Sequence, residues 1–505
     1  MKRTALIIMI ITLFSKILGF GRDIFLSYFF GATAISDAYL ISLTVPSEIF
    51  GLIGMGIATA YIPMLSRTIY NSGDEVGCQF TSNFTNIILI GVSIIFLIGM
   101  AFTESIVKLF ALGFSGETLS LTINFMKISL FGMYFTALIS IFSGYLQIKN
   151  NFVVPALIGF PLNIIVIISI FLATKGNYYL LAVGTLLASA SQFLFMLPFI
   201  KKEKFRYQLI LNFKDKRIID SLHMILPVII GTSVNQINLL VDRTIASSLT
   251  IGGVSALNYA NRLNLSIQGL FVTSIITVLY PMISSYASKQ NYEGIRKTLV
   301  ESINIITIFV LPITVGAMIF NNQVVNLLFG RGAFDEAAIQ MTSSALFFYA
   351  LGMLGFGLRE VLVRVFYSIN DTKSPMINAA MGIILNIIFN MILSPYLGIG
   401  GLALATSISA IFTTALLIIS LRKKVGPFGM KQVSISFIKI LVASSVMGIL
   451  AKLRFYYLKS LLSPNISLLV AVTIGAVIYF GIIYFMKIED VDVIVKAIKS
   501  KLLMK

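Results

Sequence analysis

Charged residues are scarce in this chain. Asp, Glu, Lys and Arg make up only 11% of its 505 residues and hydrophobic residues make up 57%, whereas a soluble domain carries about 25% charged residues. The single histidine, His223, argues against a His-based metal centre, and the single cysteine, Cys78, excludes an intrachain disulfide. No Gly-Lys-Ser/Thr sequence occurs, so the Walker phosphate loop is absent. The composition indicates a polytopic membrane protein, and enzyme motifs are mostly lacking.

Fourteen apolar stretches are long enough to cross a bilayer, since a transmembrane helix needs about 20 mainly apolar residues. We therefore predict an all-α polytopic membrane protein with fourteen transmembrane helices. The second, eighth and tenth stretches exceed the bilayer thickness, so tilt, a kink or a cytoplasmic extension must absorb the excess. The predicted spans are 7–30, 34–64, 83–103, 120–146, 153–173, 178–200, 221–247, 253–285, 298–320, 338–367, 376–396, 400–421, 433–453 and 466–486.

Basic residues in the short loops predict the orientation of the chain. They are concentrated in residues 201–217, 289–297, 422–431 and 496–505. Placing these loops in the cytoplasm puts both termini inside the bacterial cytoplasmic membrane; the basic residues after span thirteen are the exception. The same loops carry much of the net charge of +18. This charge therefore indicates topology and contact with anionic membrane lipids, and no nucleic acid partner is expected.

The two halves of the chain share short sequences at an offset of roughly 220 residues. The sequence LNII at Leu162–Ile165 in span five recurs at Leu385–Ile388 in span eleven. Six spans per unit is an even number, so both units have the same orientation, in a parallel pseudo-repeat. We predict an N-terminal six-helix lobe (1–200), a basic cytoplasmic linker (201–220), a C-terminal six-helix lobe (221–424), a C-terminal transmembrane helix pair (425–486) and a cytoplasmic tail (487–505).

Ionisable side chains interrupt several spans, although each costs about 2.5–3.5 kcal/mol at mid-bilayer. Span one carries Lys16, Arg22 and Asp23, and span eight, in the other half, carries Arg262. Guanidinium groups stay charged and match phosphate oxygens with paired donors. We therefore expect Arg22 and Arg262 to line a cavity that accepts a pyrophosphate. The alternative is that these charges form neutral ion pairs that only fix the packing of the helices.

Asp242 in span seven allows two interpretations. A carboxylate near amide and hydroxyl groups such as Asn386 and Thr406 can bind a desolvated cation. Alternatively, Asp242 forms a salt bridge with Arg243 or another neighbour. The residues by themselves do not decide between a cation site and an ion pair.

Six short sequences resemble the MurJ/MviN family of lipid II flippases, within the multidrug/oligosaccharidyl-lipid/polysaccharide exporter superfamily. Each is weak alone, but their order across the spans is specific, and the resemblance covers about residues 10–425. The sequences are Ser15–Asp23, Ser36–Tyr39, Ala60–Pro63, Asn258–Arg262, Leu328–Phe334 and Phe366–Pro375. The family's fold of two six-helix lobes and a final helix pair agrees with the repeat.

The resemblance implies outward movement, by alternating access, of an undecaprenyl-pyrophosphate-linked disaccharide-pentapeptide. It assigns substrate contacts to Arg22 and Arg262, with Lys16, Asp23, Asp37 and Ser15 nearby, and no catalytic residue. It also implies a sodium coupling site, for which the matching positions are Asp242, Asn386, Asn390 and Thr406. No organic cofactor is expected, and cell-wall synthesis proteins are candidate partners. Without an ATP site, membrane potential or an ion gradient must drive the transport.

Two positions depart from the family pattern. Lys16 stands where Gram-negative members have an arginine, which keeps the charge but loses the paired donors. Phe50 stands where another span-two arginine is found, so headgroup contacts are expected to be fewer or differently placed.

Other functions remain open from the sequence. A flippase for another polyprenyl-linked glycan would share the same features. A cation-coupled drug exporter should favour acids and aromatics over Arg22 and Arg262 in its cavity. A membrane glycosyltransferase should have a long external loop with catalytic acids, but the outer loops between the predicted spans are short. A scaffold would not need charges on facing helices.

Overall fold

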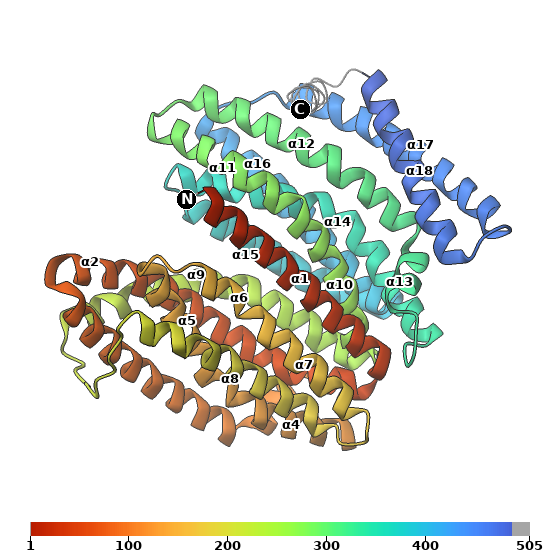
Figure 1. The fold of residues 1–505 in the computed structure, drawn as a ribbon. Helices are drawn as coiled ribbons and strands as arrows, with labels where there is room; N and C mark the ends of the chain where they lie inside the picture. Colours follow the sequence, from red (N-terminus) through yellow and green to blue (C-terminus); the bar gives the residue numbers. More distant parts are fainter. Residues whose placement is uncertain (1, 487–505) are drawn as a thin grey trace. The chain divides into compact units, whose positions relative to one another are not determined.

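The structure is a computed structural model that describes residues 2–486, and every regular element in that range is an α-helix (Figure 1). Side chains are not described for residues 2–6, 45, 48–50, 52–53, 226–228 and 230–235. The tail predicted at 487–505 and the side chain of Phe50 therefore lie outside the described residues. The helices are α1 (Lys2–Phe30), α2 (Ala34–Ala101), α3 (Thr103–Phe110), α4 (Gly116–Leu130), α5 (Gly132–Ile148), α6 (Val153–Leu157), α7 (Gly159–Ala173), α8 (Tyr179–Lys202), α9 (Lys216–Leu249), α10 (Gly253–Leu270), α11 (Val272–Ser288), α12 (Tyr292–Ile319), α13 (Asn321–Phe329), α14 (Glu336–Ser368), α15 (Lys373–Leu397), α16 (Ile399–Val425), α17 (Met430–Lys459) and α18 (Pro464–Phe485).

The long helix α2 consists of two helices joined at Gly73. The φ of 84° and ψ of 173° at Gly73 are not helical, and glycine adopts such a positive φ at little steric cost. The predicted spans 34–64 and 83–103 lie on either side of this break. The chain therefore turns between two spans without a separate loop.

Within the described residues, eleven helical stretches are long and apolar enough to cross a membrane. This confirms the all-helical membrane class predicted from composition, while the count of fourteen spans stays a prediction. The over-long stretch at 253–285 is interrupted at Phe271, where α10 ends and α11 begins. An interruption of this kind is one of the three ways in which we expected the excess length to be absorbed.

The helices form two compact units. Unit 1 comprises Met1–Ser255 together with the loop Arg331–Asp335, and unit 2 comprises Ala256–Gly330 and Glu336–Lys505. The first turn of α10 therefore belongs to unit 1 and the rest of that helix to unit 2. The two six-helix lobes that we predicted on either side of residues 201–220 remain a prediction. They were defined by a sequence repeat, whereas the two units are defined by contacts between residues.

The two units share an unusual turn at an offset of roughly 220 residues. Asn150 and Asn370 both have positive φ, at 61° and 59°. In each unit the side chain of the next residue accepts from the second residue of the following helix: Asn151 Oδ1 from the Val154 N–H at 3.4 Å, and Asp371 Oδ1 from the Ser374 N–H at 3.0 Å. This matched backbone geometry supports the pseudo-repeat by an observation independent of the sequence matches.

Asp371 also forms an ion pair with Lys424. Burial acts to raise the pKa of Asp371, but hydrogen bonds from Lys424 and Ser374 outweigh it and lower the pKa to about 2. The pair joins the end of α16 to the turn before α15, and the Asp371 side chain is 11% exposed. It links two segments of unit 2 outside the predicted spans.

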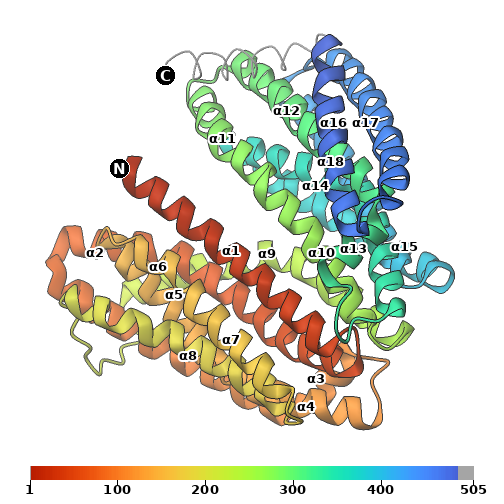
Figure 2. The same ribbon diagram turned by 45° about the vertical axis from the view of Figure 1, so that its right-hand side comes forward.

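The C-terminal helix pair packs against α12 in unit 2, as both ribbon views show (Figure 2). Ile308 and Leu311 of α12 share a buried cluster with Ile440 of α17 and Ile483 of α18. The Tyr479 hydroxyl donates to the Ile308 carbonyl at 2.6 Å. The pair is therefore attached to unit 2 by both apolar packing and a buried hydrogen bond.

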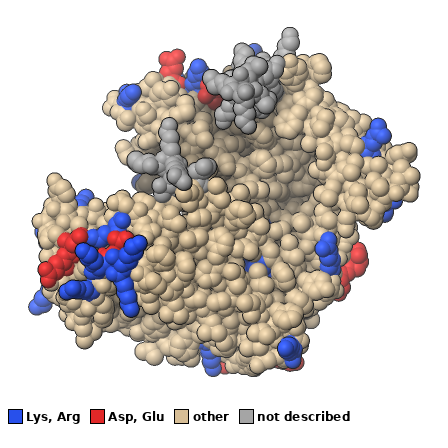
Figure 3. Space-filling model, viewed as in Figure 1, with Lys and Arg blue, Asp and Glu red and all other residues tan. Residues whose placement is uncertain are grey.

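Charge is distributed unevenly over unit 1. On the face drawn in Figure 3, most of this unit is uncharged, and Lys, Arg, Asp and Glu side chains gather toward its ends. Two of these charged side chains, Lys149 and Asp74, form an ion pair at the turn beside Gly73. An uncharged flank between charged ends is the distribution expected of a bundle that lies in a bilayer.

Candidate functional site

The Arg22–Asp23 pair of α1 is formed in the structure. Arg22 Nε and Nη2 both donate to Asp23 Oδ1, at 3.2 and 3.0 Å. The Asp23 side chain is 8% exposed and that of Arg22 is 26% exposed. A guanidinium has five N–H donors, so Asp23 uses two of them. Arg22 is therefore charge-balanced, yet it has donors left for an anionic ligand.

The other predicted residues of α1 differ in their surroundings. Lys16 is exposed, whereas Ser15 is partly buried where α1 meets α7. The Ser15 carbonyl accepts from Asn163 Nδ2 at 3.4 Å. A Cβ on Gly159 would lie only 2.0 Å from the Ser15 hydroxyl oxygen, so this glycine permits close approach of the two helices. The geometry thus gives Ser15 a packing role, and its predicted substrate role stays a prediction.

Asp37 is buried and holds the start of another helix. Its Oδ2 accepts from the Gly252 N–H at 2.7 Å, and its Oδ1 accepts from the Ser255 N–H at 2.7 Å and the Ser255 hydroxyl at 2.5 Å. Gly252 directly precedes α10 and Ser255 lies in its first turn, where N–H groups have no partner within the helix. A carboxylate also interacts favourably with the positive end of the helix dipole. Asp37 therefore caps α10 from α2.

The loop Arg331–Asp335 packs in unit 1 beside the turn between α1 and α2. The Ala333 N–H donates to the Tyr28 carbonyl at 2.8 Å. A Cβ on Gly31, whose φ is +59°, would lie 2.2 Å from the Ala333 carbonyl oxygen, and one on Gly332 would lie 2.2 Å from the Tyr28 carbonyl oxygen. Sequence reasoning missed this contact, although the glycine-containing segment Leu328–Phe334 had been singled out as a motif.

Arg262 lies on α10 in unit 2 and is partly buried. Its backbone carbonyl accepts from the Ser266 hydroxyl at 2.8 Å. Arg22 belongs to unit 1, so the two predicted cargo arginines are in different units of the protein.

Three of the four predicted cation ligands are brought together in unit 2. Asn390 Nδ2 donates to Asn386 Oδ1 at 2.9 Å, and Asn386 Nδ2 donates to the Thr406 hydroxyl at 3.1 Å. The asparagines are fully buried, and their spacing of four residues places them on one face of α15. Asp242 is also buried, on α9 in unit 1.

This group of three has the chemistry that a small hard cation requires. Amide and hydroxyl oxygens are suitable ligands for such ions, and burial excludes the water that would compete with them. Each side chain takes part in a hydrogen bond that fixes its rotamer. The donor set therefore fits the sodium ion that the resemblance implies.

Comparisons with known proteins agree with the fold. A family model described as "Lipid II flippase MurJ" matches residues 26–476. A "Probable lipid II flippase MurJ" of Buchnera aphidicola is 30% identical over 407 residues, which cover 79% of each chain. The protein of the same description from Vibrio cholerae is 28% identical, over 88% of this chain and 87% of the relative. The one from Rickettsia prowazekii is 27% identical, over 97% of this chain and 98% of the relative.

Solved structures point the same way. "Lipid II flippase MurJ, inward closed conformation" superposes with a TM-score of 0.83 and 28% identity, over 95% of this chain and 98% of the other. An inward-facing MATE family multidrug transporter of the MOP superfamily superposes with a TM-score of 0.68 at 17% identity, over 83% and 98% of the two chains, and so shares the fold. From the match of the family model over most of its length, the chain belongs to the MurJ family of lipid II flippases.

Proposed function

We propose that this chain moves undecaprenyl-pyrophosphate-linked disaccharide-pentapeptide from the inner to the outer leaflet of the bacterial cytoplasmic membrane, by alternating access and without ATP hydrolysis. Membership of the family supports a lipid-linked cargo. The observation that carries the proposal is Arg22, a guanidinium kept in an apolar helix with donors beyond those used by Asp23. A permanent cation in a span is costly, and a pyrophosphate is the kind of ligand that explains it.

Arg22 is suited to the ligand by its shape as well as its charge. Asp23 neutralises the guanidinium while the cargo is absent and fixes its orientation through two hydrogen bonds. The other donors remain in the planar geometry that matches adjacent phosphate oxygens. Arg262 and Lys16 would supply further positive charge. The cargo's pyrophosphate could then leave water without losing all of its hydrogen bonds, while its prenyl chain stays in lipid.

Alternating access requires attachments that form in one state and release in another. Two attachments in unit 1 are candidates: Asp37 with the first turn of α10, and Tyr28 with the loop at Ala333. We propose that both attachments hold one state of the transport cycle and are released in the other.

The driving force in this proposal is membrane potential, an ion gradient or both. Moving one charge through 100 mV supplies about 2.3 kcal/mol. Asn386, Asn390 and Thr406 would hold a sodium ion together with Asp242, and the ion would supply a positive charge that links transport to its gradient. Asp242 is the only carboxylate of this set, so its charge would dominate the attraction.

The topology that suits this function has fourteen spans and both termini in the cytoplasm. The distribution of basic loops supports it. Partners from cell-wall synthesis would supply or remove the cargo on the two sides of the membrane.

A flippase for another polyprenyl-linked glycan, or a cation-coupled exporter, is the second candidate. The shared fold with MATE family transporters favours it, as does the buried Asn386–Thr406 group. Arg22 argues for an anionic cargo and against a cationic drug.

The test is replacement of the arginines in a bacterial strain depleted of its own lipid II flippase. The parent chain should restore growth, and Arg22→Ala and Arg262→Ala should each fail to do so while membrane levels of the protein stay normal. Arg296→Ala is the matched control, because Arg296 donates to the Val425 carbonyl at 3.4 Å, outside the predicted spans. Growth restored by either cargo-site variant would refute the proposal.

A further inference from the structure

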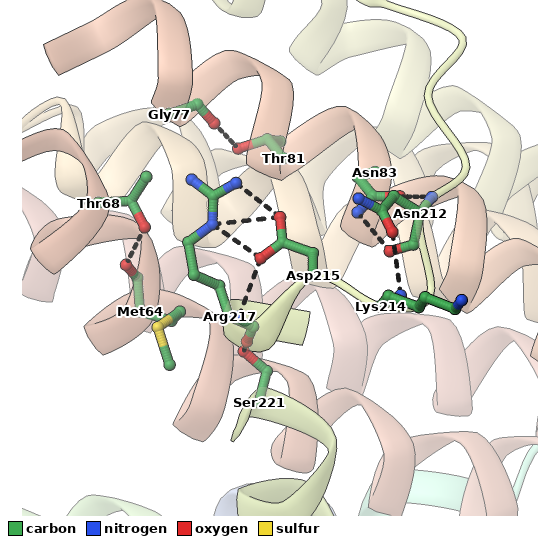
Figure 4. A network of polar contacts seen from close by, with 10 residues as sticks. All are labelled: Met64, Thr68, Gly77, Thr81, Asn83, Asn212, Lys214, Asp215, Arg217 and Ser221. Carbon is green, nitrogen blue, oxygen red and sulfur yellow. Dashed lines mark hydrogen bonds and ion pairs between the residues drawn. The ribbon is translucent and has the colours of Figure 1, made fainter. Parts of the chain in front are cut away.

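The linker between α8 and α9 is attached to α2 along one edge. In Figures 1 and 2 it leaves the end of α8 and runs along the outside of unit 1 before α9. Polar side chains of α2 hold the backbone of alternate linker residues, and Figure 4 shows part of this set. The hydrogen bonds run from the Gln208 N–H to Ser82 Oγ (3.2 Å), from Asn86 Nδ2 to the Ile210 carbonyl (2.8 Å), and in both directions between Asn83 and Asn212 (3.0 and 2.8 Å).

The opposite edge of the linker is apolar and exposed. A backbone hydrogen bond from the Ile210 N–H to the Gln208 carbonyl, at 2.9 Å, turns the chain at Leu209. Leu209, Leu211 and Phe213 lie between the residues held by α2, and their exposed fractions are 90%, 54% and 54%. Tyr207 is 55% exposed, and its hydroxyl donates to Asn86 Oδ1 at 2.7 Å, so it adds to the attachment. Three large apolar side chains close together on one edge form a surface that water alone does not stabilise.

A groove lies beside this edge on the surface of α2. It has a volume of about 310 Å³ and is lined almost entirely by apolar side chains. Gly91 forms part of its floor, and a Cβ there would meet nothing within 4 Å. The stretch from Ile87 to Ile95 covers about 12 Å of helix, similar to the depth of one leaflet of a hydrocarbon core about 30 Å thick. The lining residues are Ile87, Ile88, Ile90, Gly91, Val92, Ile94, Ile95, Phe213 and Leu222.

Basic residues flank the apolar edge. Six exposed lysines and arginines surround it: Lys201, Lys202, Lys204, Arg206, Lys214 and Lys216. The acid Asp215 forms an ion pair with Arg217 at 2.6 Å (Figure 4), and the hydrogen bond from Arg217 lowers the pKa of that carboxyl. Asp215 is therefore turned inward, and the charge presented outward is positive. Such a surface is complementary to anionic lipid headgroups.

The position along α2 fits the level of the membrane surface. Hydropathy predicts that the third span begins at residue 83, so the attachments at Ser82, Asn83 and Asn86 lie at its boundary. The groove continues from there into the apolar part of the helix. Aromatic and basic residues together are typical of this boundary.

We propose that the linker is seated in the membrane surface and holds one anionic phospholipid, with an acyl chain in the groove at Gly91 and the phosphate at Lys214 and Lys216. By the proposed topology this is a lipid of the cytoplasmic leaflet. The site is separate from Arg22, so it is a lipid contact additional to the cargo. A linker anchored in this way would hold the start of α9 at a fixed depth.

The absence of tryptophan from the chain offers a direct measurement of depth. A single tryptophan at Leu209→Trp is placed in nanodiscs that contain one protein copy and lipids brominated at known acyl positions. We expect blue-shifted emission and strong quenching by shallow bromines. The control is Glu75→Trp, at an exposed acidic position of α2, which should be quenched by aqueous iodide instead. Equal quenching by iodide of the tryptophans at positions 209 and 75 would overturn the insertion of the linker into the membrane. So would protection of the tryptophan at position 209 from iodide that appears only in discs with two protein copies.

The lipid itself is tested with Phe213→Trp, which places the reporter in the groove wall. Brominated phosphatidylglycerol should quench it several-fold more than brominated phosphatidylcholine at the same mole fraction. Lys214→Gln with Lys216→Gln should abolish this preference, whereas Lys201→Gln with Lys202→Gln should keep it. Gly91→Leu, which fills open space and should not disturb the fold, should reduce quenching by both lipids. Equal quenching of the Phe213→Trp protein by the two lipids, or no effect of Gly91→Leu, would overturn the proposed site.

Discussion

Replacement of Asp37 separates two roles that the sequence could not distinguish. The resemblance implies that Asp37 supports cargo binding, whereas the structure engages both of its carboxylate oxygens with the start of α10. If the carboxylate is mainly a helix cap, its removal should destabilise the protein even when no cargo is present. If it serves only the cargo, the unliganded protein should unfold as the parent does.

The expected magnitude follows from the donors left behind. Asp37→Ala leaves the N–H groups of Gly252 and Ser255 without their acceptor in a buried place, and each such group costs about 1–3 kcal/mol. The Ser255 hydroxyl still has Ser36 Oγ at 2.9 Å, so it adds little. We therefore expect a loss of about 2–6 kcal/mol for Asp37→Ala and, because one acceptor oxygen remains, about 1–3 kcal/mol for Asp37→Asn.

The assay is unfolding of the purified, cargo-free protein in detergent, followed by loss of helical signal. The order of stability should be parent, then Asp37→Asn, then Asp37→Ala. Glu104→Gln is the control, since Glu104 is an exposed acid that pairs with the exposed Lys108, and its unfolding should match the parent. An Asp37→Ala protein as stable as the parent would refute the capping role and leave cargo binding as the reason for this residue.

Three further predictions concern other parts of the chain. Asp371→Asn keeps an acceptor for the Ser374 N–H but loses the ion pair with Lys424, and should destabilise the protein by about 0.5–1 kcal/mol. Because the folded-state pKa of Asp371 is lowered to about 2, this loss of stability should be complete above pH 5 and shrink as the pH falls toward 2. A difference between variant and parent that grows on acidification would contradict this. Sodium should raise the melting temperature of the parent more than potassium at equal ionic strength, and Asp242→Asn or Asn386→Ala should lose that gain; equal melting of the parent in both salts would favour an ion pair at Asp242. With Cys78→Ser as background, a cysteine at Lys202 should resist an impermeant reagent added outside intact cells while one at Ser248 reacts, and the reverse pattern would refute the proposed orientation.

Much of the architecture could be predicted because it depends on local composition and periodicity. A bilayer imposes about 20 apolar residues per span, and each half of the chain shows that pattern. The asparagine pair Asn386 and Asn390 could be assigned to one helix face because the period of the helix is known, and the structure places them 2.9 Å apart, from Asn390 Nδ2 to Asn386 Oδ1. The spans 34–64 and 83–103 were predicted as separate helices, but a junction at the single residue Gly73 was not, since the polar stretch between the spans reads as a longer loop.

What could not be predicted depends on residues that are far apart in the chain. The partners of Asp37 at Gly252 and Ser255 lie more than two hundred positions away, and no local pattern connects them. The same holds for the Tyr28 carbonyl and Ala333. The linker between α8 and α9 is a third case. Its basic residues predicted the topology, but its attachment to α2 through backbone groups becomes visible only when Ser82, Asn83 and Asn86 are known to face it.

Arg22 and Asp37 show why a charge in a span does not reveal its purpose from the sequence alone. Both are ionisable, both lie near the same end of unit 1's first two helices, and both belong to motifs of the family. The Asp37 carboxylate is saturated by donors from its own protein, whereas the Arg22 guanidinium gives two of its five donors to Asp23. A buried group whose hydrogen bonds are complete stabilises one arrangement of helices. A group such as Arg22, with donors that its own protein does not use, gains hydrogen bonds when an anionic ligand binds. This difference in remaining hydrogen-bond capacity distinguishes the ligand-binding Arg22 from Asp37, which attaches one helix to another.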